Sequence, residues 1–397
     1  MLTSALLWSL AAQPARAFDA DAIPGISCVC NYLFQEEEFD VAVWERDLDG
    51  MKARGFNTVW MVNVWAAFQP QADGPYREDR LEWLRGVCRA AQVRDMNVLL
   101  VVAYIGEGWG PEGVDVPAWP LVPEHRAQHA RYLEWLAKGV ADFDNVFYLL
   151  CTEEILPATL LYQPDTRPEA VEAFRAWARR TNPDVAYWND RWQTTYTWED
   201  LRPAATSERK TWQTWQDHNR WFCSLMGELL PPMTTAIRAG DPDAVIGFHD
   251  FLIDPAIPEE GMERPQPAPC GFDFFSIGYY YVHEKSFEEN LKGLTDRMDA
   301  ASAAYAETPL MCGEIGLPVR LDSPELTQAD EELQTRWYRE ALGKLRERRF
   351  GYDIWCWRTV VKGETSSLAL LRAEDKSSRP ALTVIEEMNR RKPGEGQ

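Results

Sequence analysis

Short apolar runs alternate along the chain with segments of helical period. Eight runs consist mainly of β-branched, aromatic and other apolar side chains, the pattern of strands buried on both faces in a parallel sheet. These runs are residues 26–32, 58–65, 97–104, 146–153, 244–251, 273–281, 309–316 and 352–357. We therefore expect eight strands.

Helices are predicted between these strands. Residues 286–305 begin with Ser286 and Glu289, which form a capping-box pattern, and residues 326–349 begin with Thr327 and Asp330. Eight strands that alternate with helices predict an α/β fold, the (β/α)8 TIM barrel. A doubly wound open sheet is the alternative, although no G-x-G-x-x-G turn follows the first strand.

One connection is too long for a simple crossover. About ninety residues separate the fourth and fifth strands, where a βαβ unit needs about thirty in all. The aromatic-rich stretches "YWNDRWQTTYTWEDLRP" (187–203) and "TWQTWQDHNRWF" (211–222) lie within it. We predict a helical, aromatic-rich insertion after strand four, at about 160–240, that covers the mouth of the barrel.

The two ends of the sequence have other signatures. Residues 1–17 contain an apolar run followed by Ala15-Arg16-Ala17, which predicts a signal peptide cleaved after Ala17 and a secreted or periplasmic protein. A single catalytic domain is expected over 18–392, with a disordered tail at 393–397. No later segment approaches the roughly twenty apolar residues of a membrane span.

Composition narrows the partners. The net charge of −21, from 62 acidic and 41 basic residues, argues against binding to nucleic acid and favours a neutral or cationic partner. Aromatic faces are the usual platforms for sugar rings, although we expect most of the 18 Trp, 14 Tyr and 16 Phe to lie in the core. We expect most of the eight cysteines to act as small core residues, with Cys28 and Cys30 on opposite faces of their strand. Neither a metal nor a cofactor is predicted.

Candidate catalytic groups are the ionisable residues that end strands, because TIM-barrel active sites lie at that face. Strand four ends in "LLCTEE", with Glu153 and Glu154, and strand seven ends in "MCGE", with Glu314. These two strands face each other across a barrel mouth, so their carboxylates can converge. Two carboxylates about 5–5.5 Å apart are the machinery of retaining glycoside hydrolysis.

The same segments resemble clan A glycoside hydrolases, most closely the family 42 and family 5 types. "VFYLLCTEEI" is similar to the strand-four motif that ends in Asn-Glu, which puts Thr152 at the Asn position and Glu153 at the acid/base. "PLMCGEIG" resembles the nucleophile motif and puts Glu314 there. The competing register makes Glu154 the acid; Glu153 is favoured because a strand alternates its faces. Thr152 departs from the family pattern and leaves the contact to the sugar 2-hydroxyl in question.

Further stretches extend the resemblance over nearly the whole chain after residue 25. "GFNTVWMVNVWAAFQPQADGPY" (55–76) is similar to the second-strand segment of family 42, and 355–382 resembles the closing segment of the clan. By this resemblance, Trp355 or Trp357 lies beneath the sugar in subsite −1, and a tyrosine of strand six bonds the nucleophile. The insertion after strand four also resembles that of family 42.

The remaining candidates for substrate binding lie near strand ends. They are Asn63, Trp65, Trp109, His249, Tyr279, Tyr281 and His283, with Tyr280 as the third tyrosine that could contact the nucleophile. The leading hypothesis is a retaining β-glycosidase acting on β-linked oligo- or polysaccharide. Two alternatives are a catalytically inactive carbohydrate-binding barrel and a transglycosidase on the same scaffold. The sequence does not indicate the sugar, exo or endo action, or the oligomeric state.

Overall fold

The fold was analysed in a computed structural model of the 397-residue chain. The structure describes residues 20–31, 40–104, 110–156, 160, 163–203, 212–250, 264–358, 366–373 and 375–390. The predicted signal peptide, Trp109 and the predicted tail lie outside the described residues.

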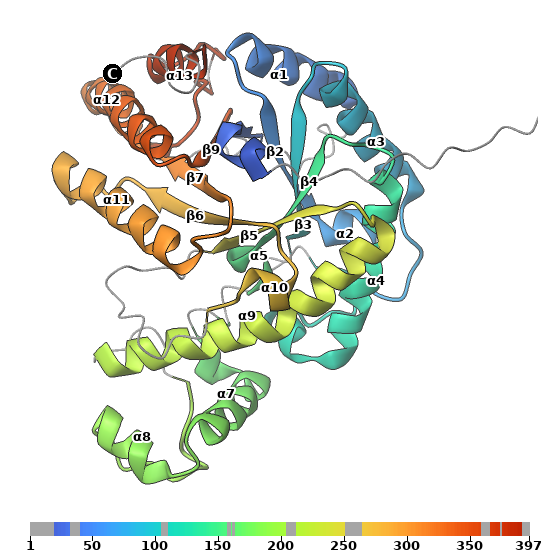
Figure 1. The fold of residues 1–397 in the computed structure, drawn as a ribbon, viewed down its shortest axis with the longest axis vertical. Helices are drawn as coiled ribbons and strands as arrows, with labels where there is room; N and C mark the ends of the chain where they lie inside the picture. Colours follow the sequence, from blue (N-terminus) through green and yellow to red (C-terminus); the bar gives the residue numbers. More distant parts are fainter. Residues whose placement is uncertain are drawn as a thin grey trace, which may run out of the picture.

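Eight parallel strands close into a barrel in the order β1-β2-β3-β4-β5-β6-β7-β9 (Figure 1). Their bounds are β1 (Ser27–Cys30), β2 (Thr58–Val64), β3 (Asn97–Tyr104), β4 (Val146–Cys151), β5 (Val245–Asp250), β6 (Phe274–Tyr280), β7 (Leu310–Gly316) and β9 (Gly351–Ile354). Each coincides with a predicted run, so the (β/α)8 barrel is confirmed. The open-sheet alternative is wrong because β1 pairs with β9 and closes the sheet. A short antiparallel pair, β8 (Val319–Arg320) and β10 (Ser366–Ser367), lies apart from the barrel sheet.

Helices surround the strands (Figure 1). They are α1 (Val41–Ala53), α2 (Trp65–Phe68), α3 (Glu78–Gln92), α4 (Pro123–Val140), α5 (Thr152–Ile155), α7 (Pro168–Thr181), α8 (Val185–Trp192), α9 (Trp212–Gly240), α10 (Pro267–Cys270), α11 (Phe287–Ala304), α12 (Pro324–Glu347) and α13 (Ala381–Arg390), with 3-10 turns η1 (Ala20–Gly25), η3 (Val116–Leu121) and η4 (Pro164–Thr166). Within the described ranges, none is long and apolar enough to cross a bilayer.

The predicted helix starts are right in one case and shifted in the other. Ser286 and Glu289 form the capping box of α11, as predicted. In α12 the N-cap is Ser323, whose side chain accepts a hydrogen bond from the Leu326 amide, and Pro324 occupies the first turn. Asp330 takes no part in the cap, because its carboxylate is held by the Arg320 guanidinium.

Strand residues alternate between two apolar clusters. One cluster, called the inner cluster, fills the barrel and consists of strand residues and residues at the barrel ends. The other, called the outer layer, packs the strands against the helices. Cys28 and Cys30 both belong to the inner cluster, so the expectation that they face opposite ways is wrong: residues two apart in a strand share a face. All eight cysteines are buried, and none is in a disulfide.

The long connection contains α7, α8 and the first half of α9, which lie together below the barrel in Figure 1. Their aromatic side chains pack on one another, as with Trp188 on Trp192 at 5.7 Å and Phe174 on Trp221 at 5.2 Å between ring centroids. Buried Asp217 of α9 accepts hydrogen bonds from Arg191 Nε (2.5 Å) and Trp192 Nε1 (2.8 Å) of α8. Much of the predicted aromatic cluster is thus the core of the insertion itself. That the insertion covers the barrel mouth stays a prediction.

Candidate active site

Glu314 lies at the carboxyl end of β7, where the strand is irregular. Ile277 of β6 pairs with Cys312, but the next residue, Gly278, pairs with Glu314, so Gly313 is an extra residue on β7. Such a bulge re-aims the side chain that follows it. The Glu314 side chain is only 5% exposed. The carboxylate can be buried at the end of this apolar strand because it has polar neighbours on two other strands.

The first neighbour is Tyr280, the last residue of β6. Its hydroxyl donates a hydrogen bond to Oε2 of Glu314. The nominated tyrosines, Tyr279 and Tyr281, instead face the outer layer, where their rings lie 5.9 and 5.3 Å from that of Trp337 on α12. Their assignment to the site is therefore corrected in favour of Tyr280, because alternate residues of β6 point to opposite sides.

The second neighbour is His249, which lies in the interior near the end of β5. Its Nε2 is 3.9 Å from Oε1 of Glu314, and its Nδ1 is 2.8 Å from Oγ of Ser276 on β6. Burial, aided by the positive charge of Arg297, lowers the pKa of His249 to about 3. The ring is neutral at neutral pH, so its contact with Glu314 is not an ion pair.

Gly313 is required by this packing. A Cβ atom at this position would lie 2.2 Å from Ser276 Oγ and 2.7 Å from His249 Nδ1. The His249–Ser276 pair therefore lies directly against the backbone that precedes Glu314. A side chain here would displace the pair or the strand.

Tryptophans form the inner wall next to His249. Trp60 of β2 meets His249 edge-on at 5.7 Å and Trp355 edge-on at 5.9 Å between ring centroids. Trp355 follows β9 and packs on the inner cluster, whereas Trp357 is in the outer layer, 6.4 Å from Phe56. Of the two tryptophans left open by the sequence, Trp355 is the one on the side of Glu314.

Strand β4 ends two residues earlier than predicted, at Cys151, which belongs to the inner cluster. Oγ1 of Thr152 lies 3.1 Å from both the His249 carbonyl oxygen and Oδ1 of Asp250, so its hydroxyl is engaged by the protein. Residues 152–155 form the short helix α5. Strand alternation therefore does not apply to Glu153 and Glu154, and that reason for preferring Glu153 is wrong. The side chains of both acids lie outside the described part of the structure.

Three other candidates, Trp65, His283 and Asn63, have no described contact with Glu314. Trp65 is buried in the outer layer, 5.8 Å from Tyr132 between ring centroids, and His283 has Nε2 2.7 Å from the Pro318 carbonyl. Asn63 is buried at the end of β2, and neither of its amide atoms has a hydrogen-bond partner within the described residues.

Three residues of this arrangement were not singled out from the sequence: Trp60, Cys151 and Ser276. Each lies on the inward set of its strand. Strand alternation is their signal, because each belongs to the same alternating set as other inner-cluster residues of its strand.

A second acid lies in the barrel interior. Asp353 of β9 is fully buried near the Cys28 thiol, and neither of its carboxyl oxygens has a hydrogen-bond partner among the described residues. Burial raises the pKa of Asp353 well above its usual value. Burial therefore favours the uncharged form of this carboxyl.

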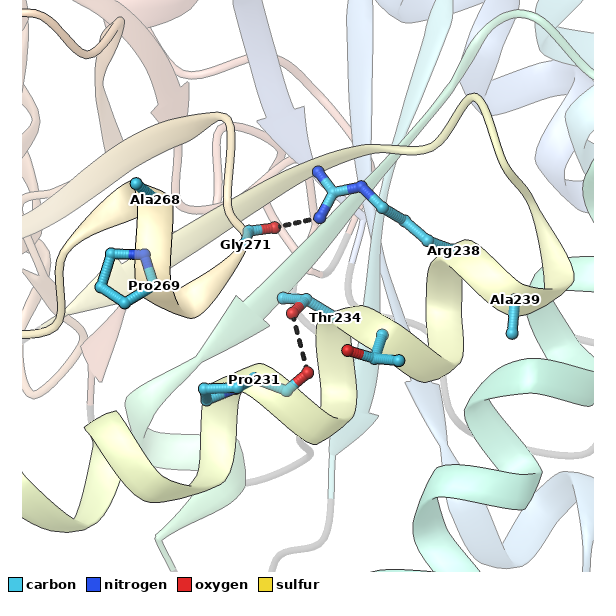
Figure 2. A pocket seen from close by; sticks show the side chains of 8 residues that line it. Pro231, Thr234, Arg238, Ala239, Ala268, Pro269 and Gly271 are labelled. Carbon is cyan, nitrogen blue, oxygen red and sulfur yellow. Dashed lines mark hydrogen bonds between the residues drawn. The ribbon is translucent and has the colours of Figure 1, made fainter.

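A surface hollow of about 500 Å³ lies elsewhere, between α9 and α10 (Figure 2). Its lining consists of Pro231, Thr234, Thr235, Arg238, Ala239, Ala268, Pro269 and Gly271. Arg238 donates a hydrogen bond to the Gly271 carbonyl across it. The hollow contains no carboxylate and lies where the chain enters β5 and β6, at the end opposite Glu314. It is not the candidate active site.

Comparisons with known proteins support the architecture. No family model matches the chain, and no curated protein matches it. Among solved structures, the chain is similar to a β-galactosidase from the Antarctic haloarchaeon Halorubrum lacusprofundi, at 16% identity and a TM-score of 0.63 over 92% of this chain and 57% of that one. It is also similar to the exo-β-1,4-mannosidase Op5Man5 from Opitutaceae bacterium strain TAV5, at 20% identity and a TM-score of 0.58 over 92% of this chain and 59% of that one.

A third similar structure is GH5_18 from Streptomyces cattleya in complex with GlcNAc, at 17% identity and a TM-score of 0.60, over 94% of this chain and 81% of that one. The chain thus spans less than three fifths of the β-galactosidase and of the mannosidase. At these identities the likeness is one of fold, and it shows that the chain is a (β/α)8 barrel built like those of the galactosidase and the mannosidase.

Proposed function

We propose that the protein is a clan A retaining β-glycosidase in which Glu314 is the nucleophile and Glu153 the acid/base. The observation that carries this proposal is the setting of Glu314: a buried carboxylate on a β-bulge at the carboxyl end of β7, hydrogen-bonded by Tyr280. Active sites of this fold lie at that end of the barrel. The fold shared with a β-galactosidase and a β-mannosidase supports the same reaction class.

The surroundings of Glu314 suit a nucleophile. A hydroxyl donor on Oε2 favours the charged form of a carboxylate and fixes its orientation, which leaves Oε1 to attack the anomeric carbon. The second carboxylic acid protonates the departing oxygen and then activates water to release the sugar. Glu153 is proposed for that role from the strand-four motif, since α5 follows β4 at the same end of the barrel.

The proposed substrate is a neutral β-linked oligo- or polysaccharide. The net charge of −21 disfavours polyanionic sugars, and Trp355 supplies an aromatic wall beside Glu314 for the sugar ring. The engaged Thr152 hydroxyl has one proton, which is shared between two protein acceptors. We infer that the 2-hydroxyl of the sugar is recognised by another group.

The test is hydrolysis of aryl β-galactosides, β-mannosides and β-glucosides and of β-linked polysaccharides, with the Glu314→Gln variant in parallel. Glutamine keeps the shape but cannot form the glycosyl-enzyme, so turnover should fall at least about 10³-fold while the fold is retained. Activity that survives in the variant would remove Glu314 from the mechanism. No turnover on any substrate, with oligosaccharide binding still measurable, would instead support the inactive binding barrel.

A further inference from the structure

Three potential metal ligands converge in the barrel interior from three different strands. Cys151 ends β4, His249 lies near the end of β5, and Glu314 lies on β7. One ligand atom of each lies within 4.8 Å of the other two, and all three residues are buried. Nε2 of His249 lies 3.9 Å from Oε1 of Glu314.

The outer hydrogen bonds orient two of these groups as ligands. Nδ1 of His249 lies 2.8 Å from Ser276 Oγ, so an N–H at Nδ1 that donates to Ser276 leaves the Nε2 lone pair directed toward the cluster. Tyr280 bonds Oε2 of Glu314, which leaves Oε1 nearest to His249. Metal-binding histidines almost always donate their other N–H to such a partner, and ligating carboxylates are held in the same way.

The donor set selects the metal. A thiolate, an imidazole and one carboxylate suit Zn²⁺ and related soft divalent ions, whereas Mg²⁺ and Ca²⁺ prefer oxygen ligands. Zinc sites with three protein ligands keep the fourth position for water or substrate. Tetrahedral bonds of about 2.0–2.3 Å place ligand atoms about 3.3–3.8 Å apart, so the site closes with side-chain shifts of about 1 Å.

We propose that Cys151, His249 and Glu314 bind one Zn²⁺ ion and that this ion is a reversible inhibitor of the barrel. Binding releases the Cys151 thiol proton to solvent and changes no oxidation state. While Oε1 of Glu314 coordinates the ion, it cannot attack a sugar, so metal and glycosyl-enzyme exclude each other. The inhibition rests on the proposed glycosidase function, whereas metal binding does not.

The binding test is titration of the full chain with Co²⁺, which replaces Zn²⁺ and reports a bound thiolate by a charge-transfer absorption in the near ultraviolet. We expect one equivalent per chain with this absorption, loss of the absorption in Cys151→Ala, and its retention in Cys88→Ala. Cys88 is the matched control because it is an equally buried thiol on α3, in the outer layer. Near-ultraviolet circular dichroism of each variant verifies the fold before titration.

Absence of the absorption in the wild-type chain would overturn the proposal, and so would its persistence in folded Cys151→Ala. If Cys151→Ala does not fold, His249→Gln provides the second test, since it should weaken Co²⁺ binding at least about tenfold. Unchanged affinity in that variant would also count against the site.

Activity separates the two proposals. If a substrate is found, Zn²⁺ should inhibit the wild-type enzyme, a chelator should restore it, and the inhibition constant should rise at least about tenfold in His249→Gln. A positive cobalt titration without any hydrolysis would support the metal site and reject the glycosidase. Hydrolysis that is insensitive to Zn²⁺ would reject the proposed inhibition and leave the glycosidase standing.

Discussion

Tyr280, at the end of β6, donates its hydroxyl hydrogen bond to Oε2 of Glu314, at the end of the neighbouring strand β7. Tyr280→Phe removes this donor without changing the volume of the ring. Because charged hydrogen bonds of this kind contribute about 1.5–3 kcal/mol, kcat/KM should fall roughly 10- to 100-fold. The acidic limb of its pH profile should move to higher pH, since the charged carboxylate loses a partner.

Tyr279→Phe is the matched control, because that side chain packs on Trp337 in the outer layer of the same strand. It should leave both kcat/KM and the pH profile nearly unchanged. An equal loss in the two variants, or a fixed acidic limb in Tyr280→Phe, would mean that Tyr280 supports the fold and not the nucleophile.

The acid/base can be assigned by comparing Glu153→Ala with Glu154→Ala. Loss of the general acid should reduce turnover of oligosaccharides at least about 10²-fold. It should spare aryl glycosides whose phenol leaving group needs no protonation, and added azide should then restore activity by attacking the glycosyl-enzyme. We expect this pattern for Glu153→Ala and less than a tenfold effect for Glu154→Ala. The reverse pattern would assign the role to Glu154.

Gly313 offers a steric test of the packing around His249. In Gly313→Ala the new methyl group would lie 2.2 Å from Ser276 Oγ, and overpacking of this kind costs about 1–3 kcal/mol. We expect a lower urea midpoint and reduced activity. In Gly227→Ala, on α9, a Cβ meets nothing within 4 Å, so that variant should gain about 0.5–1 kcal/mol from helix propensity. Equal stability of Gly313→Ala and the wild type would contradict the described packing.

Asp353 predicts an unusual pH dependence of stability. Burial raises its pKa well above the unfolded value, so the folded state holds a proton that the unfolded state releases. Its contribution is complete below the unfolded pKa of about 3.9 and is lost as pH rises through the folded pKa. Asp353→Asn keeps the shape of the side chain but does not titrate. The free energy of unfolding of the variant should therefore increase relative to that of the wild type as pH rises. A difference independent of pH would contradict this account.

Asp330 gives the opposite sign and serves as the control. Burial alone would raise its pKa, but hydrogen bonds from the Arg320 side chain and amide outweigh burial and lower it. The stabilisation is therefore present above the unfolded pKa of about 3.9 and is lost as pH falls through the folded value. Asp330→Asn should destabilise the protein by about 1–3 kcal/mol near neutral pH and progressively less in acid.

The fold was predictable because its signals are local. Eight apolar runs correspond to the eight barrel strands, and the Ser286–Glu289 capping box marks the start of α11. Thr327 was a poorer guide than Ser323, because two hydroxyl residues four apart offered competing starts and the proline after Ser323 decided between them. Closure of the sheet follows from the strand count and not from any single residue.

The site was less predictable because both faces of a parallel strand are apolar. Composition alone does not distinguish Tyr280 from Tyr279, or Trp355 from Trp357, since either residue of each pair would be buried. The bulge at Gly313 also shifts the inward set in the middle of β7, so alternation counted from Met311 would put Glu314 on the wrong side. After β4 the chain enters α5 before Glu153 and Glu154, so the alternation of side chains along a strand does not apply to these two acids.

Helix α9 has a further consequence, because one continuous helix serves both the insertion and the barrel. Its first turns bind α8 through Asp217, whereas Thr234 and Arg238 near its other end bind Cys270 and Asp273 at the entry to β6. At about 1.5 Å per residue, its 29 residues extend over about 44 Å without a linker between the two parts. The insertion therefore cannot unfold independently of the barrel, because its unfolding would also unfold a helix that packs on the barrel. A calorimetric scan should accordingly show one cooperative transition for the described chain rather than two.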